Sequence, residues 1–141
     1  MRNNLTALVE SLPMKFSYTI LYVKNVTESI AFYEKAFGLK QRFIHESGQY
    51  AEMDTGTISL AFASNELAHS NLPQGFQENT TAKLPAGIEI GFVTDDVAVA
   101  FSQAVEAGAI PFVNPNVKPW GQTVAYVRDL DGILIELCSP M

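Results

Sequence analysis

The sequence GQTVAYVRDLDGILIELCSP occupies residues 121–140 and decides the fold. Two apolar, β-branched runs, Thr123–Val127 and Ile133–Leu137, flank a turn that ends in Asp131-Gly132. An Asp-Gly pair between two such runs is a strong short-range signal for a β-hairpin. The segment is therefore predicted to form two antiparallel strands joined by this turn.

The second strand of this hairpin has two chemically different faces. Side chains alternate between the faces of a strand, so Ile133, Ile135 and Leu137 share one wholly aliphatic face that has to be buried. The other face carries a single carboxylate, Glu136, between apolar neighbours. A carboxylate in that position lies either at a sheet rim in water or toward a functional cavity, and both readings stay open.

The hairpin has a counterpart upstream, which indicates an internal repeat. In the upstream copy, Ser59 takes the place of Glu136, and farther back Tyr18–Val26 aligns with Glu89–Val97. Each of these two segments leads into a helical pattern. Repeats of this kind reveal the architecture before single elements do. The chain is predicted to contain two copies of one unit, which is a strand, a helix and three strands.

The first copy shows clear element boundaries. Phe16–Val23 alternates like a strand, and Asn25 with Glu28 three residues later has the form of a helix N-terminus. Gly38 is a typical helix stop, and Lys40–Glu46 is predicted to be the second strand. These signals place one helix between two strands.

The second copy repeats this order. Asp95 or Asp96 is expected to cap a helix that ends at Gly108. A short strand is predicted over Ile110–Val113, followed by a proline-rich loop over Asn114–Gly121. The hairpin described above completes the unit.

The segment between the two copies differs in character. Ser64–Ala86 contains two prolines and several amides, and it sustains no period, so a long irregular linker is predicted. Phe76 in its middle either anchors a lid or pins the loop to the body of the protein. Both alternatives stay open at this level.

Length and composition fit one compact domain, since the chain has 141 residues, of which 48% are hydrophobic and 17% charged. Its expected organisation is an N-terminal extension at residues 1–13 and a single domain at 14–141, with modules at 16–63 and 87–139 and the linker at 64–86.

Charge and cysteine content exclude several classes of function. The formal net charge is −6 without a basic patch, which argues against a nucleic-acid partner. No apolar run approaches the roughly 20 residues of a transmembrane helix, so no membrane partner is expected. Cys138 is the only cysteine, which rules out an intramolecular disulfide and fits a reducing compartment. A cytoplasmic location and a buried, unreactive thiol are expected.

The repeat and three motifs carry a family resemblance. The motifs are FYEKAFGL (32–39), VTDDV (93–97) and PWGQTVAYVRDLDGILIELCSP (119–140). Together they resemble the vicinal oxygen chelate superfamily, which includes glyoxalases, extradiol dioxygenases, fosfomycin-resistance enzymes and bleomycin-binding proteins. The resemblance covers residues 14–141 and implies an α+β fold of two βαβββ modules. In that fold the mixed sheet curls into a cup that holds the ligand, with the helices on its convex side.

Many members of the superfamily are dimers, so a homodimer is expected. Whether the two modules pair within one chain or between chains is left open.

The alternation of the predicted strands agrees with a sheet covered by helices on one side. A sheet buries its aliphatic face and can leave polar groups in a cavity on the other. The aliphatic face is predicted to consist of Leu21, Val23, Ile58, Leu60, Ile90, Phe92, Ile133, Ile135 and Leu137, and the opposite face to carry Tyr18, Tyr22, Ser59, Glu89 and Glu136.

The resemblance also identifies the positions at which metalloenzymes of the superfamily hold an ion. They place a ligand, usually His or Glu, on each of four strands, and the matching residues here are Tyr18, Ser59, Glu89 and Glu136. Only Glu136 retains the usual residue type, and Glu89 is an atypical replacement for His. Catalytic Zn²⁺, Ni²⁺ or Fe²⁺ typically needs three or more His or carboxylate ligands. No metal cofactor is therefore expected, and if a divalent ion binds, Glu89 and Glu136 are its ligands.

These departures favour a metal-free, small-molecule-binding protein of the bleomycin-resistance type, with a role in antibiotic resistance or a similar sequestration. Two carboxylates in a low-dielectric cup repel each other, and a bound organic cation relieves that repulsion. Aromatic side chains could stack on its ring, although Trp120 could instead close the cup rim structurally. The predicted ligand-binding residues are Tyr18, Tyr22, Ser59, Glu89, Trp120 and Glu136.

The alternative function is a metal-dependent glyoxalase-like lyase or dioxygenase that uses Glu136 and Glu89. The sequence assigns no catalytic residue and does not name the ligand. It leaves open whether any reaction is catalysed.

Overall fold

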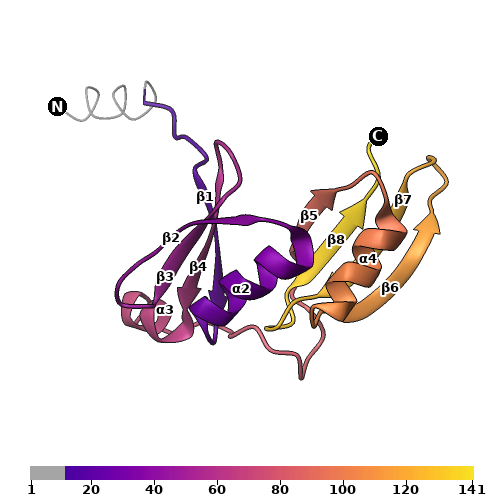
Figure 1. The fold of residues 1–141 in the computed structure, drawn as a ribbon. Helices are drawn as coiled ribbons and strands as arrows, with labels where there is room; N and C mark the ends of the chain where they lie inside the picture. The colour runs from indigo at the N-terminus through magenta and orange to yellow at the C-terminus, as the bar shows by residue number, and fades with distance from the viewer. Residues whose placement is uncertain (1–11) are drawn as a thin grey trace.

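The computed structural model describes residues 12–141, so most of the predicted N-terminal extension lies outside the described residues. The chain forms two modules joined by a linker (Figure 1). In chain order the elements are β1 (Tyr18–Val23), α2 (Val26–Phe37), β2 (Lys40–Ile44), β3 (Tyr50–Asp54), β4 (Ser59–Ser64), α3 (Asn65–Asn71), β5 (Glu89–Val93), α4 (Val97–Glu106), β6 (Ile110–Val117), β7 (Thr123–Arg128) and β8 (Leu134–Cys138).

The strands form two four-stranded mixed sheets with the same topology. The first sheet has the order β1-β4-β3-β2 and the second sheet the order β5-β8-β7-β6. The first strand of each module pairs parallel with the last, and the remaining pairs are antiparallel. The predicted α+β fold of two βαβββ modules is therefore confirmed.

The helix starts follow the predicted capping chemistry. The Asn25 side chain accepts a hydrogen bond of 2.9 Å from the backbone N–H of Glu28 at the start of α2. Gly38 ends this helix in the left-handed conformation, with φ of 70°. Of the two aspartates considered for α4, it is Asp96 that caps the helix.

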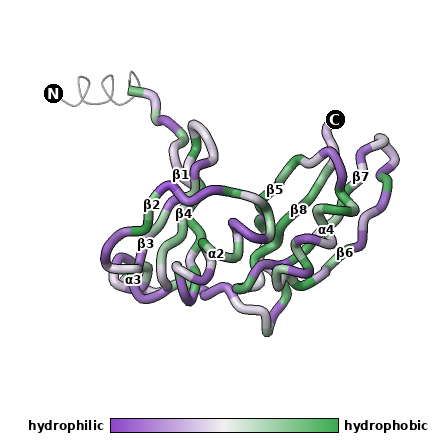
Figure 2. The backbone as a smooth tube through the Cα atoms, viewed as in Figure 1, coloured by the Kyte–Doolittle hydropathy of each residue, from purple (hydrophilic) through white to green (hydrophobic). Residues whose placement is uncertain are grey.

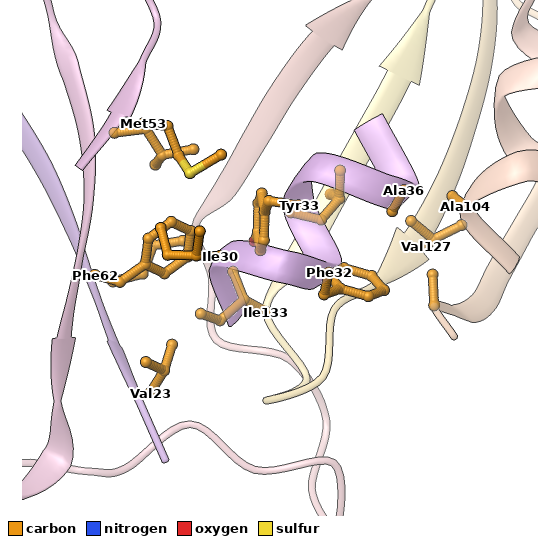
Figure 3. Packing of buried hydrophobic residues seen from close by; sticks show 14 of the residues in the cluster. Val23, Ile30, Phe32, Tyr33, Ala36, Met53, Phe62, Ala104, Val127 and Ile133 are labelled. Atoms are coloured by element: carbon orange, nitrogen blue, oxygen red, sulfur yellow. The ribbon is translucent and has the colours of Figure 1, made fainter. Parts of the chain in front are cut away.

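Helix α2 lies near the middle of the molecule, where it packs against α4, and α4 lies against the second sheet (Figure 1). In Figure 3, Met53 and Phe62 of the first sheet point toward α2, and Ala36 on the other side of α2 lies beside Ala104 of α4. Tyr33 sits between these groups and is completely buried. Buried residues of both modules form one hydrophobic cluster, and the tube in Figure 2 shows β5 and β8 as strongly hydrophobic. The two modules thus share a single core.

Each sheet has one face covered by a helix and a second face, called here the open face, that no helix of its own module covers. On the covered faces Leu21, Leu60, Ile135 and Leu137 are buried, as the alternation predicts. The prediction was wrong for Ile58, which is 44% exposed because it precedes β4 and belongs to the β3–β4 turn.

Two further boundaries differ from the prediction. The linker is not wholly irregular, because Ser64 accepts a hydrogen bond from the N–H of Leu67 and starts the seven-residue helix α3. Seven residues are too few to display a helical period. Strand β6 extends into the predicted proline-rich loop as far as Val117. It tolerates Pro115 because it is an edge strand with irregular register, where a missing N–H breaks no ladder bond.

The rest of the linker is tied to the first module. The Phe76 ring packs edge-on against Tyr22, with 4.9 Å between ring centroids, and stacks on His69 at 4.3 Å. The Asn79 side chain donates a hydrogen bond of 3.0 Å to the carbonyl of Tyr22. These contacts favour the reading in which Phe76 pins the loop to the body of the protein.

The turn between β7 and β8 joins the second module to the first. The Tyr33 hydroxyl of α2 donates a hydrogen bond of 2.6 Å to the Asp129 carboxylate, which also accepts from the backbone N–H groups of Asp131 and Ile133. Asp131 in turn accepts a hydrogen bond of 2.9 Å from the backbone N–H of Lys24. Burial raises the pKa of Asp129, while these hydrogen bonds act in the opposite direction. Both carboxylate oxygens of buried Asp129 thus accept hydrogen bonds.

The same turn also holds the linker. Buried Arg128 donates through Nε to the carbonyl of Gly132 and through Nη2 to the carbonyls of Thr80 and Lys83, at distances of 2.9, 3.0 and 2.8 Å. Three backbone carbonyls therefore satisfy a guanidinium that would otherwise be costly to bury.

No helix among residues 12–141 has the length and apolar character needed to cross a membrane.

Gly132 should be the least replaceable residue of this turn. Its φ is 83°, and a Cβ there would lie 2.5 Å from the carbonyl oxygen of Thr80. We expect Gly132→Ala to lower the free energy of unfolding by about 2–5 kcal/mol, because left-handed strain costs about 1–2 kcal/mol and overpacking about 1–3 kcal/mol. Gly48→Ala is the control, since Gly48 has φ of 71° but open space around its Cβ position. Equal losses for both variants in urea denaturation would show that the contact with Thr80 is unimportant.

Candidate functional site

The open face of the second sheet carries a pair of carboxylates. Glu89 begins β5, and Glu136 lies on the adjacent strand β8, opposite Gly91 in the parallel register. Tyr126 pairs with Glu136 across β7 and β8, and its hydroxyl donates a hydrogen bond of 2.8 Å to Glu136 Oε1. The structure therefore brings together the two glutamates that the sequence singled out, and it adds a tyrosine donor.

The nearby acids of this group act on one another electrostatically. Partial burial raises the pKa of Glu89, and both the charge of Glu136 and a hydrogen bond between the two carboxyl groups raise it further. The hydrogen bond to Glu136 also raises the pKa of Tyr126 to about 12. Tyr126 thus remains a hydrogen-bond donor at neutral pH, and Glu89 gives up its proton less readily than an ordinary glutamate.

Cys138 lies beside these acids but is not an activated nucleophile. Its side chain is buried, as predicted, and its Sγ lies 3.6 Å from the carbonyl oxygen of Phe92. Burial and the neighbouring charge of Glu136 raise the pKa of the thiol. A thiol in these surroundings stays protonated and is inert.

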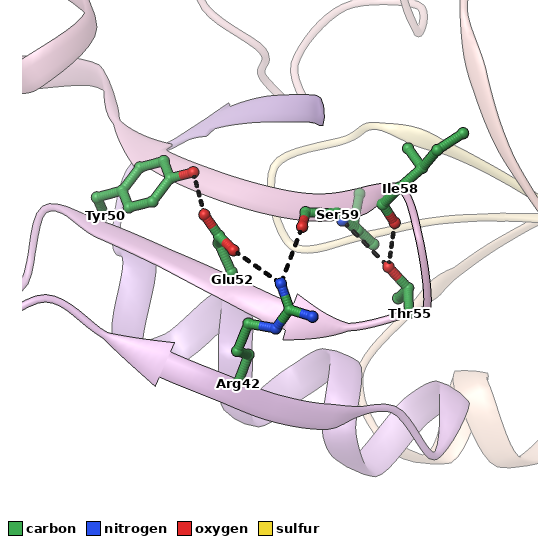
Figure 4. A network of polar contacts seen from close by, with 7 residues as sticks. Arg42, Tyr50, Glu52, Thr55, Ile58 and Ser59 are labelled. Atoms are coloured by element: carbon green, nitrogen blue, oxygen red, sulfur yellow. Dashed lines mark hydrogen bonds and ion pairs between the residues drawn. The ribbon is translucent and has the colours of Figure 1, made fainter. Parts of the chain in front are cut away.

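A second polar group, missed in the sequence, lies on the open face of the first sheet (Figure 4). The Tyr50 hydroxyl donates a hydrogen bond of 2.8 Å to the Glu52 carboxylate, which pairs with Arg42 Nη1 at 3.6 Å. The same Nη1 donates to Ser59 Oγ at 3.5 Å. The available signal was the alternation of Tyr50 and Glu52 in β3, which puts both on one face.

The remaining predicted site residues lie in different places. Tyr18 pairs with Ser59 across β1 and β4 and is 55% exposed. Tyr22 lies under Phe76 of the linker. Trp120 is 63% exposed in the β6–β7 turn, where its Nε1 donates a hydrogen bond of 2.9 Å to Gln122. The predicted residues thus fall into separate groups on the two sheets, and Trp120 lies in the turn that leads into β7, the strand of Tyr126.

The register of the sheets corrects the predicted equivalence of Ser59 and Glu136. Tyr18 and Glu89 begin the corresponding strands β1 and β5, and they pair with Ser59 and Leu134, respectively. Ser59 is therefore the structural counterpart of Leu134. The prediction was displaced by two residues, a shift that leaves each side chain on its predicted face.

The corrected register further weakens the case for a metal ion. The counterpart of Glu136 in the first module is Ala61, which cannot ligate. The four superfamily positions then hold Tyr18, Ala61, Glu89 and Glu136. Within residues 12–141, no group of three or more His, Cys, Asp or Glu side chains is arranged to hold a metal ion. The donor set does not fit a catalytic transition metal.

Two small pockets follow the seam between the modules. One of about 240 Å³ is lined by Ser59 and Ile58 together with Gly91 and Phe92, and another of about 140 Å³ lies between Thr19–Tyr22 and the start of β8. They show that the edge strands β1 and β5 lie near each other, although the two sheets are not hydrogen-bonded. Both pockets are smaller than the roughly 300–1,000 Å³ of typical ligand sites.

The fold and the positions of these groups define a glyoxalase-like protein. Residues 16–141 match the family model of the glyoxalase-like domain, so the chain belongs to this family within the vicinal oxygen chelate superfamily. The protein YwbC of Bacillus subtilis (strain 168), described as uncharacterized, is 30% identical over 132 residues, which are 86% of this chain and 94% of YwbC.

Two solved structures show the same fold. A glyoxalase-related enzyme from Fulvimarina pelagi has a TM-score of 0.78 at 18% identity, covering 91% of this chain and 89% of its own. A glyoxalase/bleomycin resistance protein/dioxygenase family enzyme from Burkholderia phytofirmans PsJN has a TM-score of 0.77 at 20% identity, covering 91% of this chain and 100% of its own.

The donor set predicts that the protein carries no stoichiometric transition metal. Protein purified without chelators should contain Zn, Ni and Fe far below one ion per chain, because two carboxylates and a neutral tyrosine bind such ions weakly. Elemental analysis measures this directly, with Glu136→Gln as the matched variant. One ion per wild-type chain that disappears in the variant would contradict the prediction.

Proposed function

We propose that this protein binds a small organic cation with an aromatic or heterocyclic ring, without a metal ion, on the open face of the second sheet. The observation that carries the proposal is the pair of carboxylates, Glu89 and Glu136, on one face of the adjacent strands β5 and β8, with Tyr126 hydrogen-bonded to Glu136. The name of the similar structure from Burkholderia phytofirmans contains the words bleomycin resistance protein, and these words are compatible with binding as a function.

The physical reason is charge compensation. Two neighbouring carboxylates repel each other when both are ionised, and a bound cation offsets that repulsion. The hydroxyl of Tyr126 keeps Glu136 oriented. Tyr126 and exposed Trp120 offer aromatic faces for the ring of the ligand.

Sequestration is the role that these residues support best. The thiol of Cys138 is buried and protonated, and the donor set does not suit Lewis-acid chemistry. Binding alone needs only the two carboxylates and an aromatic face. A cytoplasmic location, in keeping with the lone thiol, is part of the same proposal.

A homodimer would complete the binding site. Tyr18 and Ile20 lie on the open face of β1 and are 55% and 44% exposed, Phe16 just before this strand is 68% exposed, and Val93 on β5 is 68% exposed. Exposed apolar side chains on unpaired edge strands favour association with another copy. A two-fold dimer would cover them and place the open face of one chain's first sheet near the second sheet of its partner.

The carboxylate pair predicts charge-selective binding. Titration of Trp120 fluorescence with phenethylamine should show saturable binding, and the neutral 2-phenylethanol should bind far more weakly. Glu136→Gln should weaken phenethylamine binding by a factor of about 30 to several thousand, because losing one partner of a desolvated charge pair costs about 2–5 kcal/mol.

Glu106→Gln is the control for that experiment, since Glu106 is exposed at the end of α4, on the opposite side of the second sheet. It should bind phenethylamine like the wild type. Preference for 2-phenylethanol, or equal affinities of Glu136→Gln and wild type, would refute the proposal.

The exposed β1 residues predict the assembly state. Light scattering at micromolar concentration should give twice the chain mass of 15.5 kDa, and Ile20→Lys should shift the protein toward monomer. Val99→Lys makes the same exchange at an exposed position of α4 and should leave the dimer intact. A monomeric wild type would disprove the dimer.

A further inference from the structure

The proposed function makes no use of the charged group on the open face of the first sheet. We propose that Arg42 forms an anion-binding subsite there, which takes the carboxylate of a small aromatic acid. This inference goes beyond cation binding at the second sheet and does not depend on it. It rests on how Arg42 is aimed, held and left partly unpaired.

A β-bulge aims the Arg42 side chain. Between β2 and β3, Gln41 pairs with Met53 and Phe43 pairs with Glu52, so Arg42 is the additional residue. In a regular strand Arg42 and Phe43 would point to opposite faces. With the bulge both residues lie opposite Glu52, and the Arg42 side chain contacts Glu52 and Ser59 on the open face.

Buried partners hold one end of the guanidinium. The Glu52 side chain is only 10% exposed and Ser59 is buried, and both engage Arg42 through the same atom, Nη1. Glu52 is itself held by the Tyr50 hydroxyl. Burial and this hydrogen bond raise the pKa of Tyr50. Tyr50 therefore keeps its proton, and its hydrogen bond stabilises the negative charge of Glu52.

The other edge of the guanidinium is available for a ligand. Arginine has five N–H donors in a planar fork, and within residues 12–141 the Nε and Nη2 donors of Arg42 have no hydrogen-bond partner. The side chain is 46% exposed. This edge matches the two oxygens of a carboxylate, which it can bind bidentately.

Aromatic side chains lie on the same face of the first sheet as Glu52, on β2 and β3. Phe43 is 40% exposed, and its ring centroid lies 6.1 Å from that of Tyr50. A fixed cation among exposed aromatic faces suits an acid with an aromatic ring, whose ring can pack while its carboxylate pairs.

The experiment uses 3-phenylpropanoate as the probe and the full-length protein. Binding should be saturable and should shift the Arg42 Nε–H signal in ¹H–¹⁵N NMR spectra. Arg42→Gln should weaken binding at least about tenfold, and Arg42→Lys should fall between because lysine keeps the charge but lacks the fork. Lys40→Gln removes an equal charge from the same strand and should leave the affinity unchanged.

The variants separate this inference from the proposed function. Glu136→Gln should reduce phenethylamine binding but not 3-phenylpropanoate binding, and Arg42→Gln should do the reverse. Far-UV circular dichroism verifies that each variant is folded, and Arg42→Lys keeps the test valid if Arg42→Gln unfolds. Absence of saturable 3-phenylpropanoate binding, an unmoved Arg42 signal, or equal weakening by Lys40→Gln and Arg42→Gln would overturn the anion subsite.

Discussion

The hydrogen bond of 2.6 Å between the Tyr33 hydroxyl and the Asp129 carboxylate is the constraint on which the rest of the structure depends. Its partners are separated by 96 residues and come from different modules. A buried carboxylate without donors would cost several kcal/mol. Two backbone N–H groups of the turn satisfy one oxygen of Asp129, and the hydroxyl from α2 satisfies the other, so this bond helps to set the position of one module against the other.

That junction also determines which faces remain available. Because α2 and α4 pack together in the shared core, the covered faces of both sheets are used for folding. The polar groups of the two candidate sites lie on the open faces, where they do not compete with the core. Arg128 extends the same logic to the linker, which it holds through the carbonyls of Thr80 and Lys83.

The two open faces have opposite chemistry although their topology is the same. The second sheet presents Glu89 and Glu136, whereas the first sheet presents the guanidinium of Arg42 above a buried carboxylate. The corrected register explains part of this difference, since Ala61 stands where the second module has Glu136. The repeat thus preserved the fold, while the side chains on the open faces diverged.

Local rules were enough to predict much of the fold from sequence. The Asp131-Gly132 hairpin, the Asn25 cap and the strand alternation depend on neighbouring residues, so they could be read directly, and they placed Glu89 and Glu136 on one face. The equivalence of Ser59 and Glu136 could not be read reliably, because a period of two fits equally well after a shift of two residues. Only the tertiary structure could decide the strand register, the bulge that aims Arg42 and the bond between Tyr33 and Asp129. Each of these depends on pairing between distant segments, for which the residue pattern of a single segment carries no information.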